Sequence, residues 1–521
     1  MSTPPATSTG VRRYLRVGDA DVHLRVFGRT GTTLLVVSDE PGAHATERAA
    51  VGALRDQGWC PVVVDLPGIG DTIGSHALPA TEAAALLLAV ADSLGATSFG
   101  VLTFGYAAAV VEPLRALADS RLEVAMHRRV PMAELWSDHR DALIRLRQLL
   151  EPRRDGAHLL VAWDHVRMRR IFSTWQRRGV EDRTTEPIPN GHDLHEAVLP
   201  ILAAPALYVD ALERLVDAHS NTLHSNTRHS INPSKSPPAP SPGIDRPART
   251  FVDTPSGQVH VRLFGRRSER PPLLLLHPSP GSAASYEAVG AEFARDRLVI
   301  APDMIGNGLS EKPKHDAMRT IDMYADDAEA VLDALNVDEC DVWGTHTGAL
   351  VAVELAIHHP ARVCGLGVDG ITLFDDDETA DVLANYLPPF ELDDYGSHLA
   401  RAWGMRHDMS LFWPWYRHDG TGVRELGALD PDALHAITVE LLRSGPTFRL
   451  AYSAAFRYPT RQQLPKVLVP MLLSSNPADP LRVHLAEAKR LKPDLALIDT
   501  FGFGEGLAAT VGAFDTWYAH L

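Results

Sequence analysis

Short apolar runs and segments of helical periodicity alternate through the second half of the chain. Runs of about four to eight residues that end in turn-forming residues are typical of strands buried on both faces. The pattern predicts strands at 259–265, 273–277, 297–303, 340–344, 362–370, 467–476 and 496–502, and helices at 283–296, 321–335 and 346–359. Strands that alternate with helices predict an α/β protein with a mostly parallel sheet and helices on both faces.

The first part of the chain repeats this pattern at a spacing of about 240 residues. The stretch 151–175 aligns without a gap with 391–415, and eight of the 25 positions are identical. Self-similarity of this kind indicates a tandem duplication. The second copy continues for about 60 residues, Pro465 to Leu521, after its matching region ends. We therefore expect a truncated first copy, without the last strands and helices of the second.

A segment rich in Ser, Asn and Pro separates the two copies at residues 217–248. Such a composition buries too little apolar surface to offset the entropy lost on ordering, so it predicts a disordered linker. The expected domains are 11–216, a truncated and degenerate copy, and 249–521, the complete copy.

Composition narrows the classes of partner. The 521 residues carry a formal net charge of −16, which argues against binding to nucleic acids or anionic membranes. No apolar run approaches the ~18 residues of a membrane span, and the first ten residues lack the apolar core of a secretory signal. The three cysteines fit neither a disulfide framework nor a zinc site. We therefore predict a cytoplasmic protein that acts on a small molecule and holds no metal.

Three motifs carry a resemblance to a known family. HPSPG (277–281) and GTHTG (344–348) each follow a predicted strand, and DMIGNGLS (303–310) overlaps the end of a third. Together they resemble the α/β-hydrolase fold superfamily. The resemblance implies a helical cap over the active site, and the aromatic-rich segment at about 375–460 stands where that cap would be.

The resemblance also implies a nucleophile, an acid and a histidine at set positions. The nucleophile position, normally a serine, is His346; the acid matches Asp479, with Asp369 as an alternative; and Glu505 stands in place of the family's histidine. An acyl–serine intermediate therefore cannot form, because residue 346 has no hydroxyl group. A histidine with a pKa near 6.5 suits a general base, which Glu505 or Asp479 could orient.

Further residues are expected around this base. The backbone N–H groups of Ser279 and Thr347 are candidates for an oxyanion hole, because the prolines on either side of Ser279 have no N–H. Arg406 is a candidate for binding a substrate carboxylate. The predicted substrate pocket contains His277, His398, Trp403, Arg406 and Trp415.

Three functions remain open from the residues. The first is hydrolysis of a small apolar ester or other carbonyl compound, with His346 activating water. The second is a cofactor-free lyase or isomerase step in which His346 abstracts a proton. The third is an inactive binding or scaffold protein. No phosphate-binding or dinucleotide-binding loop occurs, so no cofactor is expected.

The first copy lacks the corresponding catalytic groups. Gly105 aligns with His346, Ser38 with His277 and Arg128 with Asp369. This copy is therefore expected to be structural, either packing on the second copy or forming a homodimer surface.

Overall fold

The computed structural model divides the chain into two compact units. Unit 1 comprises Met1–Gly243 with Leu392–Ala400, and unit 2 comprises Ile244–Glu391 with Arg401–Leu521. The structure describes residues 10–521 except 29, 43–47, 75, 129–135, 173–174, 176–177, 185–187, 225–246, 315, 425–426, 501–503 and 505.

Unit 2 contains a mostly parallel sheet, as the apolar runs predict. The strands lie in the order β14-β13-β12-β11-β9-β10-β8-β7, and only the pairings of β7 with β8 and of β8 with β10 are antiparallel. The strands are β7 (Ala248–Thr254), β8 (Gly257–Phe264), β9 (Leu273–Leu276), β10 (Val299–Pro302), β11 (Cys340–Thr345), β12 (Val363–Asp369), β13 (Met471–Ser475) and β14 (Ala496–Asp499).

Helices cover both faces of this sheet. Successive side chains of a strand point to opposite faces, so Leu274 packs in one core cluster with α10 and α11, whereas Leu275 packs in the other with α9 and α18. The helices that pack around the sheet are α9 (Glu287–Phe293), α10 (Ile321–Ala334), α11 (Thr347–His358), α16 (Thr460–Gln463), α17 (Leu485–Leu491) and α18 (Leu507–Tyr518).

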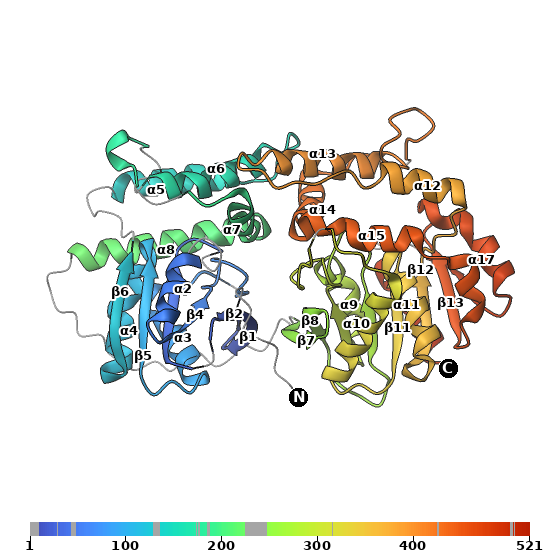
Figure 1. The fold of residues 1–521 in the computed structure, drawn as a ribbon, viewed down its shortest axis with the longest axis horizontal. Coiled ribbons are helices and arrows are strands. Elements are labelled where there is room, and N and C mark those ends of the chain that lie inside the picture. The colour runs from blue at the N-terminus through green and yellow to red at the C-terminus, as the bar shows by residue number, and fades with distance from the viewer. Residues whose placement is uncertain are drawn as a thin grey trace. The chain divides into compact units, whose positions relative to one another are not determined.

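A helical insertion separates β12 from β13. It contains α12 (Asp376–Asn385), α13 (Ser397–Leu411), α14 (Pro431–Ser444) and α15 (Phe448–Arg457). Helix α15 lies next to α11 at one end of the sheet (Figure 1). This places aromatic residues of the insertion near the turn that joins β11 to α11.

Unit 1 repeats the first six strands of unit 2. Its order β1-β2-β4-β3-β5-β6 matches β7-β8-β10-β9-β11-β12, and nothing in its described residues corresponds to β13 and β14. The strands are β1 (Val11–Val17), β2 (Ala20–Val26), β3 (Thr32–Ser38), β4 (Trp59–Val64), β5 (Phe99–Phe104) and β6 (Leu122–Arg128). The helices are α2 (Arg48–Asp56), α3 (Ala80–Ser93), α4 (Val111–Ala118), α5 (Trp136–Leu149), α6 (Ala157–Ile171), α7 (Gly191–Ala203) and α8 (Pro205–His224).

The boundaries differ from the prediction in two places. Helix α8 continues to His224 and β7 begins at Ala248, so the expected linker 217–248 is helical at its start; residues 225–246 lie outside the described part. The polar composition of this segment predicted disorder because the segment can bury little apolar surface. An existing helix can nevertheless extend into such a segment, because each added residue forms one more hydrogen bond. Residues 392–400 belong to unit 1, where the Gly191 N–H donates to Asp394 at 2.6 Å.

None of the helices that the structure describes has both the length and the apolar character needed to cross a membrane.

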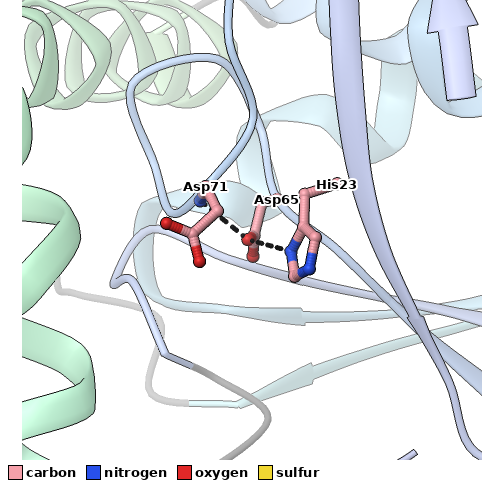
Figure 2. Close-up of side chains that lie close together, drawn as sticks. All are labelled: His23, Asp65 and Asp71. Atoms are coloured by element: carbon pink, nitrogen blue, oxygen red, sulfur yellow. Dashed lines mark hydrogen bonds and ion pairs between the residues drawn. The ribbon is translucent and has the colours of Figure 1, made fainter. Parts of the chain in front are cut away.

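A buried histidine–aspartate pair fixes the same loop in both units. In unit 1, Asp65 accepts from His23 Nδ1 at 2.8 Å and from the Asp71 N–H at 3.0 Å, as Figure 2 shows. These three residues each offer a metal-ligand atom within 4.8 Å of the others. In unit 2 the same hydrogen bonds form although Leu309 replaces Asp71. Hydrogen bonding alone therefore accounts for this geometry.

Asp303 is the equivalent carboxylate in unit 2 and is almost inaccessible to solvent. It accepts from His260 Nδ1 at 2.9 Å and from the N–H groups of Ala283 and Leu309 at 2.8 Å each. Burial acts to raise the pKa of this carboxyl, but the charges and hydrogen bond of its partners hold it well below the usual range. Asp303 therefore joins three chain segments through one buried anion.

Replacing Asp303 with Asn should destabilise unit 2 by about 3–5 kcal/mol, because it removes one partner of a buried pair. Urea unfolding followed by tryptophan fluorescence measures the change. Asp253→Asn, on an exposed side chain of β7, is the control and should change stability by less than about 0.5 kcal/mol. Equal stability of both variants would contradict the role assigned to Asp303.

Candidate active site at the turn between β11 and α11

His346 is the single residue between strand β11 and helix α11. Its backbone has φ 48° and ψ −111°, a conformation that non-glycine residues rarely adopt. The backbone at Gly344 and Gly348 packs so closely that a Cβ on either would overlap neighbouring main-chain atoms. The two glycines of GTHTG therefore permit the sharp turn that projects His346 from the end of the sheet.

The imidazole of His346 is paired with a carboxylate that follows β13. Its Nε2 lies 2.9 Å from Oδ2 of Asp479, in the turn that follows β13. The other oxygen of Asp479 accepts the Leu481 N–H at 2.9 Å, which fixes the carboxylate's orientation. Of the two candidate carboxylates that the structure describes, Asp479 rather than Asp369 is the direct partner. Glu505 lies outside the described residues.

The pair shifts both pKa values in the directions expected of a histidine–carboxylate couple. Burial lowers the pKa of His346, but the hydrogen bond and charge of Asp479 and the charge of Asp369 outweigh it, so the pKa is raised above 6.5. Burial raises the pKa of Asp479, but the hydrogen bond and charge of His346 lower it below 3.8 overall. The ring is therefore a stronger base than an isolated imidazole.

Asp369 lies close by but is held by other groups. Ser474 Oγ donates to its Oδ1 at 2.6 Å, and its backbone oxygen accepts the His346 N–H at 3.2 Å. Burial raises the pKa of this carboxyl. Asp369 thus acts on His346 through its charge and through the backbone, without a direct bond to the ring.

A cavity of about 60 Å³ opens beside the ring. The His346 side chain keeps 45% of its surface exposed, whereas Asp479 behind it is 9% exposed. One ring edge is thus available to a ligand while the other is bonded. The cavity is lined by Ser279, His346, Thr347, Leu350, Thr372, Phe374, Tyr386, Trp413, Tyr452, Ala455, Phe456 and Leu481.

Two of these residues carry the predicted oxyanion-hole donors. Thr347 is the first residue of α11, where a backbone N–H has no acceptor within its own helix. Ser279 follows β9 and lines the cavity, and its hydroxyl donates to Asn307 at 3.2 Å. Ser279, His346 and Thr347 thus all line the same cavity.

His277 and His398 do not line the cavity, in contrast to the prediction. His277 Nε2 accepts the Met304 N–H at 2.9 Å, and its Nδ1 donates to the Pro278 oxygen at 2.7 Å. Burial lowers the pKa of this ring, and both nitrogens are engaged, so His277 braces the loop. His398 is buried in unit 1, with Nε2 3.1 Å from Nδ1 of His195.

The two predicted tryptophans also lie outside the cavity wall. Trp415 donates from Nε1 to the oxygen of Tyr386 at 3.3 Å, so it supports the roof from behind. Trp403 belongs to α13 and is 7% exposed. The roof itself is built by Tyr386, Trp413, Tyr452 and Phe456. Aromatic enrichment predicts such a roof, but which rings face inward depends on how the helices are rotated.

Two arginines of the insertion bring positive charge close to this roof. Arg406 Nη1 lies 3.3 Å from the sulfur of Met409, and Arg424 Nη1 donates to the Met409 oxygen at 3.1 Å. The charge of Arg424 acts to lower the pKa values of both His346 and Asp479. Among the described residues, neither arginine pairs with a carboxylate, and the Nε of each is buried without a partner. Arg424 was not predicted, because its loop shows no periodic pattern.

Residues 271–497 match the family model described as the alpha/beta hydrolase fold. With the sheet order and the turn at His346, this match identifies unit 2 as a member of the α/β-hydrolase fold superfamily. The chain is similar to a 2-hydroxymuconate semialdehyde hydrolase of Pseudomonas sp. strain CF600, with 42% identity over 125 residues, 23% of this chain and 44% of that protein. A proline iminopeptidase of Heyndrickxia coagulans is 30% identical over 114 residues, 22% of this chain and 39% of that protein.

The chain thus spans less than half the length of these curated relatives. Among solved structures, the enol-lactonase from Burkholderia xenovorans LB400 is similar at 17% identity and a TM-score of 0.39, covering 52% of this chain and 97% of that one.

Substituting Asp479 with Asn should lower the pKa of His346, because the interactions that raise it are lost while burial remains. NMR titration of the His346 ring measures this pKa. We expect a value above 6.5 in the parent and a lower one in Asp479→Asn. Asp253→Asn, on the exposed side chain of β7, leaves the ring's partners in place and is the control. An unchanged ring pKa in Asp479→Asn would show that the 2.9 Å contact does not govern its protonation.

Proposed function

We propose that unit 2 is a hydrolase that uses His346 as a general base on water, without a covalent serine intermediate. The observation that carries this proposal is the 2.9 Å contact between His346 Nε2 and Asp479, with the rest of the ring open to the cavity. A carboxylate that orients an imidazole and stabilises its protonated form is the arrangement by which hydrolases activate an attacking oxygen. Here that oxygen would belong to water, because residue 346 has no hydroxyl.

The reaction follows from this geometry. His346 takes a proton from water, and the hydroxide oxygen attacks the substrate's carbonyl carbon. The carbonyl oxygen becomes an oxyanion that accepts from the N–H groups of Ser279 and Thr347. The C–O bond to the leaving group then breaks, and the protonated His346 returns its proton to the departing alcohol. Asp479 remains ionised throughout and stabilises the imidazolium.

The size of the effect limits the substrate. A positioned base contributes about 10²- to 10⁴-fold, which corresponds to roughly 3–5 kcal/mol of activation free energy. This is sufficient for activated esters, lactones and related carbonyl compounds but small for an amide. The apolar aromatic roof favours a small substrate with one apolar face.

The two arginines support a substrate that also carries a carboxylate. Arg406 and Arg424 lie near the roof without a carboxylate partner among the described residues, and the Nε of each is buried without an acceptor, which is costly. A bound anion would remove that cost. The curated relative named 2-hydroxy-6-oxo-2,4-heptadienoate hydrolase, 33% identical over 123 residues, acts on a compound whose name denotes a carboxylate.

Replacing His346 with Ala or Gln should reduce kcat/KM for an activated ester by roughly 10²- to 10⁴-fold, because no base remains at the turn. A panel of p-nitrophenyl esters, lactones and β-diketones provides the assay. His520→Ala, a change of an exposed histidine near the C-terminus, is the control and should retain parental rates. Equal rates in His346→Ala and the parent would remove the base from the mechanism.

The same panel separates the alternatives. Carbon–carbon cleavage or isomerisation without incorporation of solvent ¹⁸O would indicate a lyase or isomerase that uses His346 to abstract a proton. Ligand binding without turnover by any variant would indicate a binding protein.

Arg406→Met and Arg424→Met should each raise KM for a carboxylate-bearing ester by roughly 10- to 100-fold, because a charge-assisted contact is lost. The KM for the corresponding methyl-capped substrate should change little. Steady-state kinetics with the two substrates provide the measurement. Arg401→Met, which changes an exposed arginine of α13, the helix that carries Arg406, is the control. If both substrates respond alike, the arginines do not recognise a carboxylate.

A further inference from the structure

Unit 1 repeats the strand-to-helix turn of unit 2, with Gly105 in place of the histidine. Strand β5 ends at Phe104, Gly105 follows with φ 61°, and Tyr106 stands where Thr347 stands in unit 2. The Tyr106 N–H donates to Oδ2 of Asp39 at 2.8 Å. The N–H that would face an oxyanion in unit 2 therefore already holds an anion in unit 1.

The anion comes from the loop that corresponds to the second wall of the oxyanion hole. Asp39 and Glu40 directly follow β3. In unit 2 the corresponding residues are Pro278 and Ser279, which follow β9 after one intervening residue. The Glu40 N–H donates to Ser38 Oγ at 3.0 Å, which holds this loop in a tight turn. Asp39 is 2% exposed, so solvent hardly reaches its carboxylate.

A buried arginine pairs with both of these carboxylates. Arg169 of α6 aligns with Met409, and its Nη2 lies 2.6 Å from Asp39 while its Nε lies 2.9 Å from Glu40. Arg170 contributes a second cation, 2.6 Å from the other oxygen of Glu40. The four side chains balance two positive and two negative charges, and each is at most 7% exposed.

We infer that the former active site of unit 1 is a small-carboxylate site permanently occupied by the unit's own Asp39. Gly105 supports this assignment, because a Cβ there would overlap the Asp39 carboxylate. Two independent donors, the Tyr106 N–H and the Arg169 guanidinium, converge on one oxygen of Asp39. Unit 1 therefore takes no carbonyl substrate, and its site stabilises the fold.

The inference predicts what happens when the internal ligand is removed. Asp39→Ala leaves a cavity of about carboxylate size that faces a backbone N–H and an arginine, which is the chemistry that binds formate or acetate. Asp39→Asn fills the same volume with a neutral amide, so it should lose charge complementarity without opening a cavity. The two variants thus separate the charge of Asp39 from the space it occupies.

Thermal unfolding of the full chain in sodium formate and in sodium chloride at equal ionic strength tests this inference. Asp39→Ala should lower the Tm by on the order of 10 °C, because it breaks a buried ion pair. Formate should restore part of this loss with a saturable dependence, whereas chloride should not. The parent and Asp39→Asn should show no formate-specific shift, and Asp39→Ala combined with Arg169→Met should lose the restoration.

Several results would overturn the inference. These are a parental Tm in Asp39→Ala, absence of any formate response in that variant, or an equal formate response in the parent. If Asp39→Ala folds poorly, the yield on refolding replaces the Tm. A higher yield in formate than in chloride then supports the internal carboxylate site, and equal yields contradict it. Neither readout depends on the activity of unit 2.

Discussion

The left-handed backbone at His346 is the constraint on which the site in unit 2 depends. A φ of 48° turns the chain sharply between β11 and α11, so the ring leaves the sheet beside the first free N–H of the helix. The turn is possible because Gly344 and Gly348 let main-chain atoms approach closely. Asp479 then reaches the ring from the turn after β13, a strand that has no counterpart among the described residues of unit 1.

The two units show different outcomes for the same turn. In unit 2, Thr347 at the start of α11 lines a cavity, and a histidine–carboxylate pair lies beside it. In unit 1 the corresponding N–H of Tyr106 is satisfied by Asp39, and Arg169 pairs with the same carboxylate. Because the described residues of unit 1 include no counterpart of β13 or of Asp479, none of them would offer a histidine at position 105 a carboxylate from that direction. Filling the site with an internal ion pair satisfies the same buried donors.

Periodicity and turn chemistry predict the fold of unit 2 closely, because its strands are short apolar runs buried on both faces. The predicted helix 321–335 is Ile321–Ala334, and the predicted strand 340–344 is Cys340–Thr345. His346, Ser279 and Thr347 could be located because each is tied to a strand end by a local motif. His277 and His398 could not be placed, since the direction of a side chain depends on tertiary packing. Arg424 and Asp39 could not be assigned either, because their roles arise from contacts between residues distant in sequence.

The pH dependence of kcat/KM, compared with the titration of the His346 ring in the same protein, tests the central claim most directly. The rate should rise with pH through a single midpoint above 6.5, because the protonated ring cannot accept a proton from water. That midpoint should coincide with the ring pKa measured by NMR. A rate that is independent of pH across the ring's titration, or a midpoint that does not follow it, would contradict the account.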